Sequence, residues 1–547
     1  MRIALAQINS TLGDFAGNKE KILSFVTLAK EKKATLVIFP EASLFGYHPF
    51  DLLEREVLVK HQTKVLNELV KKIPEGIQIL IGGFEKNKNK RGRPYYNSAF
   101  LCKKNKIIKT FHKELLPTGD VFDEARFIEK GSLKDNYFKI NKKNFFLTIC
   151  EDIWAWDDKK GRSLYSENPI KKIKKQKTDL VINMSASPFF TGKLKQREYV
   201  VKKTAQFFGA PVVYVNLVGA QDEIIYDGQS FLVDKKATQK FICHAFEEEL
   251  NVFDLDTLKD WNADAAKLKM SKKLKSSSVE LLHKALVLGL RDFSAKTGLK
   301  QVHLGLSGGI DSAVVACLAV DALGPNNVKL FALPTEFNQP ESFSLAKSLA
   351  KNLYIDLETI SIQPIFETIK KTIDQSFNIH DFGLVHENLQ SRIRGLMLMA
   401  YSNKAGSLLL ATGNKSEYAT GYTTLYGDMC GGLAVIGDLT KNQVYELAAC
   451  YNKQHEIIPD QIIRRAPSAE LKPNQKDQDS LPAYDLLDKS VINIVEQVKN
   501  TVSKTDEWLV EKLMKSEFKR WQAPPILKVT KHSFGRGRRY PVAHKAK

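Results

Sequence analysis

Apolar and polar residues alternate in short blocks along the first half of the chain. Residues 2–8 and 36–39 form apolar runs, and residues 18–33 between them carry apolar side chains at helical spacing. Short apolar runs predict strands, and apolar spacing near 3.6 residues predicts a helix. By the same criterion, further strands are predicted at residues 77–82, 98–102, 106–111, 145–150, 180–183, 212–216 and 229–233. The first half is therefore expected to be a layered α/β domain rich in strands.

The hydrophobic pattern breaks from residue 255 onward. There the sequence becomes LDTLKDWNADAAKLKMSKKLKSSS, which is polar, rich in lysine and without apolar periodicity. A stretch of this kind is typical of a segment between domains. We therefore predict a first domain at residues 1–255, a linker at 256–278 and a second domain at 279–547.

A helix and then repeated strand, loop and helix units follow the predicted linker. Ser277 and Glu280 have the S-x-x-E spacing of a capping box, which predicts that a helix begins there. Strands are predicted at residues 302–306, 328–333 and 408–411, and helices at 313–323, 342–353 and 384–404. Elements that alternate in this way predict a parallel, doubly wound sheet, as in a Rossmann-like domain.

The composition is that of a folded protein with more than one domain. The chain has 547 residues, of which 43% are hydrophobic and 10% aromatic, whereas disordered chains combine low hydrophobicity with high charge. Its six cysteines include no C-x-x-C pair, which argues against a disulfide framework and favours a reducing compartment. No secretory apolar region begins the chain, and no run reaches the roughly 18 apolar residues of a membrane span. We expect a cytoplasmic protein with no membrane partner.

The chain is strongly basic, with 82 Lys and Arg residues against 62 Asp and Glu residues and a formal net charge of +20. This excess allows attraction to nucleic acid, anionic membranes or phosphorylated small molecules, and does not choose among them. Most of the charge lies in lysine runs, which are typical of solvated loops and helix faces. The tail differs, because residues 519–547 hold nine Lys and Arg residues and no acidic residue, with Phe534 and Tyr540 interleaved. That pattern would suit contact with a polyanion.

Three reactive side chains follow apolar strands in the first half: Glu41 after LVIFP, Lys113 after IIKTFH and Cys150 after FFLTIC. Taken alone, each has a plain structural explanation, because a cysteine at a strand end is commonly an inert small hydrophobe and an exposed charge is commonly only solvated. Together they form a chemical set. A carboxylate can activate a thiol, and an ammonium can stabilise both the thiolate and the oxyanion of a tetrahedral intermediate.

The segments FPE, FHKELLP and TICEDIW, which carry these residues, resemble the Glu, Lys and Cys blocks of the nitrilase superfamily, and CEDIW resembles its glutamine-hydrolysing branch. The resemblance implies an αββα sandwich. It also implies Glu41 as proton acceptor, Lys113 as oxyanion stabiliser and Cys150 as the nucleophile that forms a thioester with the glutamine acyl group. Ammonia would leave first, and water would then release glutamate.

Two further residues follow from the same resemblance. The segment SASPF and the lysine after it are similar to the family's glutamine-binding strand, which implies Ser187 and Lys193 as glutamine contacts. One position departs from the family pattern. The chain reads LPTGDVFDE, so Gly119 replaces a tyrosine that the family uses beside glutamine.

A Gly/Ser-rich loop, LGLSGGIDS, lies between a predicted strand and a predicted helix of the second half. Backbone N–H groups of such a loop and the helix N-terminus can bind phosphate, although a loop of this kind can also be only a tight turn. It is neither a Walker A loop nor a G-x-G-x-x-G loop. SGGxDS resembles the pyrophosphate loop of enzymes that cleave ATP between its α- and β-phosphates. The resemblance implies ATP contacts at Gly305, Leu306, Ser307, Gly308, Gly309, Ile310, Asp311 and Ser312.

In that loop Asp311 would also help to hold Mg²⁺, because a hard cation prefers carboxylate and phosphate oxygens. Later blocks, among them ENLQSRIRG, ATGNKSEYATGYTTLYGDMCGG and FKRWQAPPILKVT, resemble the glutamine-dependent NAD synthetases. The resemblance implies that Thr412 contacts ATP, that Glu417 serves Mg²⁺ or the substrate, and that Asn388 and Lys519 contact deamido-NAD⁺.

The same family resemblance covers two segments near the predicted nucleotide site. Residues 467–482 form a polar stretch that is similar to the family's mobile lid and that could also be a surface linker. LPTEFNQPES, residues 333–342, departs from the commoner MPSxYSSExS of the family. The family also implies homo-oligomers built from synthetase-domain dimers, up to octamers.

The resemblance implies one reaction for the two halves. ATP would adenylate the nicotinate carboxylate of deamido-NAD⁺, and ammonia from glutamine would attack the adenylate to give NAD⁺, AMP, pyrophosphate and glutamate. The sequence leaves two other function classes open. A pyrophosphate-loop enzyme acting on RNA would explain the basic tail and predicts salt-sensitive RNA binding, but no RNA-binding module is recognisable, so we expect no nucleic-acid partner. A non-catalytic interaction protein would be expected to lack the reactive residues.

Overall fold

The computed structural model describes residues 1–158, 160–259 and 278–545, and the chain divides into two compact units, Met1–Lys275 and Ser276–Lys547. Most of the predicted linker, and Ser277 of the predicted capping box, lie outside the described residues. The helix that Glu280 was predicted to open is present as α6 (Ser278–Thr297).

Two six-stranded sheets form the first unit. The first sheet has the order β16 (Glu249–Asp254), β1 (Arg2–Gln7), β2 (Leu36–Ile38), β3 (Gln78–Lys86), β4 (Tyr95–Lys103) and β5 (Lys106–His112). The second has the order β15 (Gln239–Ile242), β14 (Phe231–Val233), β11 (Val212–Asn216), β10 (Leu180–Ser185), β9 (Lys143–Ile149) and β8 (Tyr137–Ile140). In each sheet the central strands are parallel and antiparallel strands lie at the edges.

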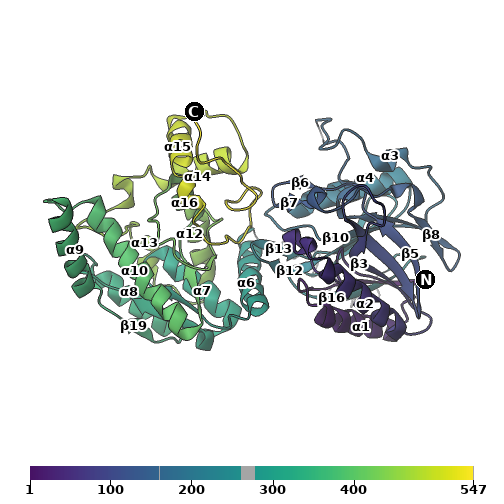
Figure 1. Ribbon diagram of the computed structural model, residues 1–547, viewed down its shortest axis with the longest axis horizontal. Coiled ribbons are helices and arrows are strands. Elements are labelled where there is room, and N and C mark those ends of the chain that lie inside the picture. The colour runs from purple at the N-terminus through teal and green to yellow at the C-terminus, as the bar shows by residue number, and fades with distance from the viewer. Residues whose placement is uncertain (159, 260–277, 546–547) are drawn as a thin grey trace. The chain divides into compact units, whose positions relative to one another are not determined.

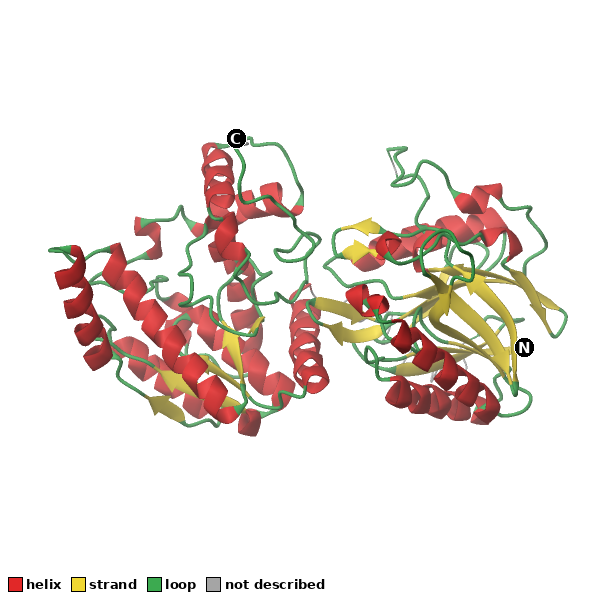
Figure 2. Ribbon diagram, in the orientation of Figure 1, coloured by secondary structure: helices red, strands yellow, loops and turns green. Residues whose placement is uncertain are grey.

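The two sheets pack face to face between two layers of helices. Side chains alternate along β1, so Ile3 and Leu5 contact the second sheet while Ala4 and Ala6 contact the helices on the other side. Helices α1 (Phe15–Glu31) and α2 (Glu56–Lys72) cover the first sheet, and α3 (Pro169–Lys172) and α4 (Lys193–Phe208) cover the second (Figure 2). The αββα sandwich that the resemblance implied is confirmed.

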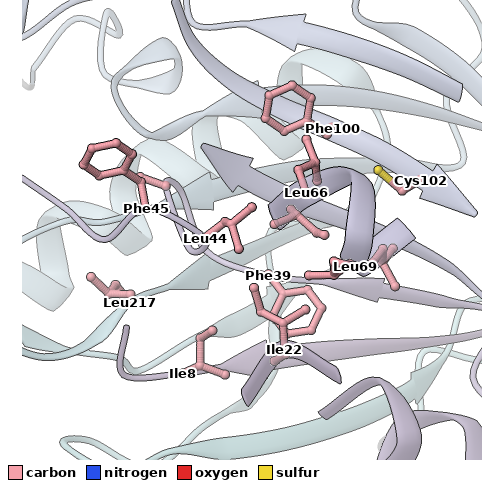
Figure 3. Packing of buried hydrophobic residues seen from close by; sticks show 14 of the residues in the cluster. Ile8, Ile22, Phe39, Leu44, Phe45, Leu66, Leu69, Phe100, Cys102 and Leu217 are labelled. Atoms are coloured by element: carbon pink, nitrogen blue, oxygen red, sulfur yellow. The ribbon is translucent and has the colours of Figure 1, made fainter. Parts of the chain in front are cut away.

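Figure 3 shows the apolar layer between the first sheet and its helices. Ile22 of α1 and Leu66 and Leu69 of α2 point toward Phe39 and Leu44, which follow β2. All five side chains have 2% or less of their surface exposed. This packing fixes the segment that directly contains Glu41.

The second unit is built on a five-stranded parallel sheet with the order β19 (Leu357–Thr359), β18 (Val328–Ala332), β17 (Val302–Gly305), β20 (Leu408–Ala411) and β21 (Leu433–Ala434). The doubly wound sheet predicted from the sequence is confirmed. The strand order reverses beside β17, and ligands of such sheets bind at the carboxyl ends of the strands at this switch point. Helices that precede, follow or flank these strands include α7 (Ile310–Leu323), α8 (Pro340–Asn352), α9 (Gln363–Phe377), α10 (Leu384–Ala405), α11 (Lys415–Thr420) and α12 (Lys441–Tyr451) (Figure 1).

Some predicted boundaries are wrong, and several strands were missed. The strand predicted at 145–150 ends at Ile149, because Cys150 has a φ of +43° and opens a 3₁₀ turn. The hairpin of β8 and β9 was missed because its turn, Asn141 and Lys142, has positive φ angles but no glycine to mark it. The edge strand β16 pairs with β1, which lies about as far away in the sequence as the first unit allows, and a local pattern does not reveal such a pairing.

The basic tail is folded rather than free, within the residues that the structure describes. Lys528 and Arg520 are 2% and 7% exposed, and the buried Phe534 ring contacts the guanidinium groups of Arg520 and Arg538. The tail therefore offers fewer free cations to a polyanion than its composition predicted. Among the described helices, none is long and apolar enough to cross a membrane.

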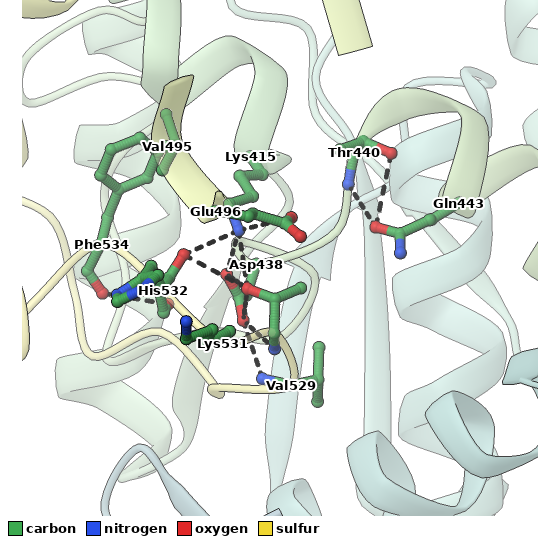
Figure 4. Close-up of polar contacts among 12 residues, drawn as sticks. Lys415, Asp438, Thr440, Gln443, Val495, Glu496, Val529, Lys531, His532 and Phe534 are labelled. Atoms are coloured by element: carbon green, nitrogen blue, oxygen red, sulfur yellow. Dashed lines mark hydrogen bonds and ion pairs between the residues drawn. The ribbon is translucent and has the colours of Figure 1, made fainter. Parts of the chain in front are cut away.

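A buried lysine connects this tail to α11. Lys415 Nζ donates to Glu496 Oε1 at 2.8 Å, to Thr530 Oγ1 at 2.7 Å and to the His532 carbonyl at 2.9 Å (Figure 4). It also forms an ion pair with the buried Asp438 at 2.9 Å. Helix α11, which carries Glu417, is thereby fixed by residues more than 100 positions later in the chain.

Candidate active sites

Glu41 is the most fully bonded of the three predicted reactive residues in the first unit. Its Oε1 accepts from Lys113 Nζ at 2.8 Å and from Asn97 Nδ2 at 2.8 Å, and its Oε2 accepts from the Ala186 backbone N–H at 2.9 Å. Its side chain is 1% exposed. Burial raises the pKa of Glu41, although the Lys113 charge opposes that shift. The carboxyl group is thus held in one orientation and disposed to take up a proton.

Lys113 lies between two carboxylates. Besides Glu41, Glu124 receives a hydrogen bond from Lys113 Nζ, at 3.0 Å to Oε1, and Tyr47 Oη donates to the same oxygen at 2.7 Å. Burial lowers the pKa of Lys113, but the charges of Glu124 and Glu41 outweigh it and hold the pKa well above its ordinary value. The ammonium therefore stays charged. Glu124 was not assigned from the sequence, although it stands in the VFDE stretch beside Gly119.

Cys150 lies at the end of β9, in a backbone conformation that a residue with a side chain rarely adopts. Its thiol is buried, and burial raises its pKa well above the ordinary value, with the Glu41 charge acting in the same direction. The Lys113 charge and a hydrogen bond from the Ala186 backbone lower it. Charges on Glu41 and Lys113 both act on the thiol, so the structure brings the three predicted residues into one buried site.

Ser187 follows β10 and is held by a buried arginine. Arg197 Nε donates to Ser187 Oγ at 3.2 Å, and its guanidinium forms an ion pair with Asp227 at 2.7 Å. Arg197 and Asp227 are 0% and 1% exposed. The Ser187 backbone N–H also donates to Asn216 at 2.8 Å. Arg197 thus fixes the predicted glutamine contact, and no sequence motif had indicated it.

Lys193 begins α4, and its ammonium lies 3.8 Å from the ring centre of Trp154. Burial and then the Arg197 charge lower its pKa to about 8, although Glu151 and Cys150 oppose the shift. Glu151 follows the nucleophile in sequence and accepts a hydrogen bond from Tyr165 Oη at 2.8 Å. Charges of opposite sign on Lys193 and Glu151 therefore both act on the Cys150 thiol, and the sequence had not indicated this pair.

Gly119 lies in a short hairpin strand, β6 (Thr118–Gly119), with a φ of +142°. A Cβ atom at this position would meet no other atom within 4 Å. The tyrosine side chain of the family pattern is therefore absent here, and the space beside Gly119 is open.

A cavity of about 510 Å³ lies at the switch point of the second unit. It is lined by the following predicted residues: Gly305, Leu306, Ser307, Gly309, Ile310, Asp311, Ser312, Asn388, Thr412, Glu417 and Lys519. Gly308 is not among the lining residues. Its φ is +82°, and a Cβ there would lie 2.2 Å from the Ser342 carbonyl oxygen, so this position requires glycine for backbone packing.

The loop after β17 ends at the N-terminus of α7, where Gly309 is the N-cap. Ser312 Oγ donates to the Gly309 carbonyl at 3.0 Å and lies 3.1 Å from Ser307 Oγ, which closes the loop on itself. The N-terminus of a helix carries unsatisfied N–H groups and partial positive charge. The loop therefore presents a preformed anion site to the cavity.

Asp311 lies opposite a buried lysine that the sequence analysis missed. Lys441 Nζ, in a side chain that is 2% exposed, donates to Asp311 Oδ2 at 2.5 Å and lies 3.7 Å from Glu417 Oε1. Asn414 Nδ2 donates to the other Asp311 oxygen at 2.9 Å. Lys441 thus lies between the two predicted metal ligands.

The two carboxylates fit a magnesium ion in their chemistry. Burial and the Asp311 charge raise the pKa of Glu417 well above its ordinary value although Lys441 opposes the shift, and a bound divalent cation would oppose it further. The described residues contain no cluster of three or more Asp, Glu, His or Cys side chains that could hold a metal ion. Asp311 and Glu417 would then supply two ligands, and phosphate oxygens and water the remainder.

The predicted deamido-NAD⁺ contacts lie together around the loop after α11. Asn388 Oδ1 accepts from Thr424 Oγ1 at 2.8 Å, and Lys519 Nζ donates to the carbonyl groups of Gly421 and Thr423 at 2.7 and 2.6 Å. Both side chains line the same cavity as Asp311. Residues more than 200 positions apart in the sequence therefore share one site.

The polar stretch predicted at residues 467–482 contacts the segment at 333–342 that departs from the family pattern. Glu470 Oε1 accepts from Ser342 Oγ at 2.5 Å, and its Oε2 accepts from Asn338 Nδ2 at 3.2 Å. All three residues line the cavity. Residues 333–342 thus border the cavity and bind the polar stretch at residues 467–482.

Two family models match the chain. Residues 2–263 match carbon-nitrogen hydrolase and residues 282–523 match NAD synthase. The chain is 42% identical to the glutamine-dependent NAD(+) synthetase of Synechocystis sp., covering 99% of this chain and 98% of the relative. It is 35% identical to that of Thermotoga maritima, covering 100% and 99%.

Solved structures agree with these matches. The glutamine-dependent NAD+ synthetase of Acinetobacter baumannii in complex with ADP has a TM-score of 0.77 and 33% identity, covering 99% of this chain and 98% of that chain. The structure from Cytophaga hutchinsonii, at 19% identity and a TM-score of 0.80 over 100% of this chain and 98% of that chain, shows the same fold. The chain therefore belongs to the family of glutamine-dependent NAD(+) synthetases, which are enzymes.

Proposed function

We propose that the chain makes NAD⁺ from deamido-NAD⁺, ATP and glutamine, with ammonia produced in the first unit and consumed in the second. The observation that carries this proposal is the pairing, in one chain, of a buried Glu41–Lys113–Cys150 cluster with a cavity that contains the Asp311 loop. Membership of the family supports the same assignment.

In the first unit the Cys150 sulfur attacks the side-chain carbonyl carbon of glutamine. Burial raises the pKa of Glu41, so its carboxylate can take up the thiol proton. Burial also raises the pKa of the thiol, so the proton leaves the sulfur only as the S–C bond forms. Glu41 then gives this proton to the leaving nitrogen, the C–N bond breaks, and ammonia departs from a thioester. Water attacks the thioester, its proton returns through Glu41 to sulfur, and glutamate is released.

The Lys113 ammonium stabilises the negative oxygen of each tetrahedral intermediate. Its bonds to Glu41 and Glu124 hold it in place without deprotonating it. For substrate recognition, Ser187 and Lys193 contact glutamine. The Lys193 ammonium suits the α-carboxylate of the amino acid, and the Glu151 carboxylate suits its α-ammonium.

In the second unit the nicotinate carboxylate of deamido-NAD⁺ attacks the α-phosphorus of ATP, and the bond to pyrophosphate breaks. Ammonia then attacks the acyl carbon of the adenylate, the bond to AMP breaks, and loss of a proton gives the amide. The loop at residues 305–312 and the Lys441 ammonium hold the phosphates, Thr412 contacts ATP, and Asn388 and Lys519 orient the dinucleotide. Asp311 and Glu417 would hold Mg²⁺, which when bound neutralises charge on phosphate oxygens.

We also propose that the enzyme forms homo-oligomers built from dimers of the second unit, up to octamers, in the cytoplasm. Helix α10 exposes Leu396, with 62% of its surface accessible, and Tyr426 and Trp521 are exposed at 63% and 69%. Tyr426 Oη donates to Gln522 Oε1 at 3.4 Å, and a Cβ at Gly395 would lie 2.8 Å from the Tyr426 carbonyl oxygen, so the three segments that carry these side chains lie close together. We propose that a second copy covers them. None of the six cysteines, all of which lie in the part of the chain that the structure describes, forms a disulfide bond, as suits a reducing compartment.

Product stoichiometry tests the proposal. Wild-type protein supplied with deamido-NAD⁺, ATP, Mg²⁺ and glutamine should form NAD⁺, AMP and pyrophosphate in equal amounts, with at least one glutamate per NAD⁺. Release of ADP and phosphate in place of AMP and pyrophosphate would contradict the adenylation step, and NAD⁺ formation without glutamate would contradict the glutaminase step.

A further inference from the structure

The backbone at Cys150 is bent by a neighbouring carboxylate. Cys150 has a φ of +43°, a left-handed conformation that is strained for a residue with a side chain. Such strain persists only where the surroundings hold it. Asp152, two residues later in the same 3₁₀ turn, accepts the Ile149 backbone N–H on its Oδ2 at 2.8 Å. The bond spans Cys150 and closes the turn that points the thiol into the site.

The other oxygen of the same carboxylate reaches the segment that carries Lys113. Asp152 Oδ1 accepts the backbone N–H groups of Glu114 and Leu115, each at 2.9 Å. These are the first two amides after Lys113. One buried carboxylate therefore bonds to the residue before the nucleophile and to the residues after the oxyanion stabiliser, although they lie on different sheets.

We infer that Asp152 is a positioning residue that sets the placement of the Cys150 thiol relative to the Lys113 ammonium. This inference rests on the proposed glutaminase function of the first unit. Asp152 is fully buried and bonds to backbone amides on both of its oxygens, so its effect on the reaction passes through the two segments that it joins.

The free-energy cost of burying the Asp152 carboxylate supports the inference. Burial raises the pKa of Asp152 to about 7 even though the three backbone N–H groups act in the opposite direction. A neutral amide at this position could accept on one side only, because its nitrogen is itself a donor. Three amides in two directions therefore require a carboxylate, and Asn at this position would lose either the turn at Cys150 or the bond to the Lys113 segment.

The test compares Asp152→Asn with a matched control, Asp179→Asn, in the full-length enzyme. Asp179 Oδ2 accepts the Asn144 backbone N–H at 2.8 Å at the opposite end of β9, away from the nucleophile. Glutamine hydrolysis is measured as kcat and KM, and the rate of iodoacetamide alkylation at Cys150 is followed by mass spectrometry. Misplacement of reacting groups by about 1 Å can cost on the order of 100-fold in rate.

We expect Asp152→Asn to lower kcat for glutamine hydrolysis by 10- to 100-fold, to leave KM within about twofold, and to change the alkylation rate. Asp179→Asn should change neither kcat nor the alkylation rate. Wild-type kcat in Asp152→Asn, or an equal loss in both variants, would overturn the inference. If Asp152→Asn does not fold, Asp152→Glu decides the matter in the same assays, because its longer side chain shifts the two segments. Lower kcat would then support the positioning role, and wild-type kcat would refute it.

Wild-type glutaminase activity keeps the two proposals apart. If the wild-type enzyme does not hydrolyse glutamine, the proposed function fails. If it does and the Asp152 variants match it, only the positioning role fails.

Discussion

Lys441 Nζ lies 2.5 Å from Asp311 Oδ2 although the two residues are 130 positions apart in the sequence. Burial opposes the positive charge, but Asp311 and then Glu417 outweigh it, so the pKa of Lys441 is raised and the side chain stays charged. This ion pair places one fixed positive charge beside the loop that we propose binds the pyrophosphate of ATP. The proposed nucleotide site therefore contains a positive charge supplied by the protein, the Lys441 ammonium.

Replacement of Lys441 should impair synthesis with either nitrogen source. Lys441→Met removes the charge beside Asp311 and leaves the Asp311 and Glu417 carboxylates without their shared cation, so NAD⁺ formation should fall at least 100-fold with glutamine and with ammonium alike. A steady-state assay with both sources checks this. Lys453→Met is the control, because Lys453 is an exposed lysine that follows the end of the same helix. A variant at Lys441 that loses only the glutamine-driven reaction would contradict the assignment.

Part of both sites could be predicted from the sequence. Glu41, Lys113 and Cys150 each follow an apolar strand, and strand ends are where such folds collect their reactive groups. Lys441 could not be predicted, because locally it is only the first residue of a helix after Thr440. Its burial depends on Asp311, which is contributed by a different strand and helix unit.

Glu124 and Asp152 illustrate the same limit. Both stand in segments that the sequence analysis had quoted for other residues, yet neither has a local feature that indicates burial. Their partners, Lys113 in one case and the backbone amides of Glu114 and Leu115 in the other, come from separate strands or loops. The local pattern predicts strands and reactive ends, and the tertiary packing decides which further side chains surround them.

Glutamine recognition should weaken at alkaline pH. Burial and Arg197 lower the pKa of Lys193 to about 8, so its ammonium loses its proton, and its attraction for the α-carboxylate, as the pH rises through 8. The glutamine kcat/KM should therefore decline above pH 8. In Lys193→Arg the guanidinium remains charged, and the decline should move to higher pH. An unchanged pH profile in that variant would show that Lys193 does not govern recognition.

The second unit should lose stability on mild acidification. His303 is fully buried, its Nε2 lies 2.9 Å from the Leu398 carbonyl oxygen, and its Nδ1 lies 2.8 Å from Ser407 Oγ. Burial lowers its pKa below the ordinary 6.5, so the unfolded chain takes up a proton at a higher pH than the folded chain does. The contribution is fully present above pH 6.5 and is lost as the pH falls below that value.

Urea unfolding at pH 7.5 and 5.5 measures this effect. The free energy of unfolding of the wild type should fall more than that of His303→Asn, by up to about 1.4 kcal/mol over this interval. Because other groups titrate in both proteins, only the difference between them reports on His303. Equal losses in the two proteins would mean that His303 is not kept neutral by burial.

The most direct test of the two-site account is NAD⁺ formation by Cys150→Ala with glutamine and with ammonium as alternative nitrogen sources. The substitution removes the thiol in the first unit and leaves the cavity around Asp311 unchanged. We predict that the variant loses the glutamine-driven reaction, by at least 1000-fold, and keeps the ammonium-driven reaction within about twofold of wild type. Retention of glutamine-driven synthesis, or loss of both reactions in a folded protein, would contradict a separate thiol-dependent source of ammonia.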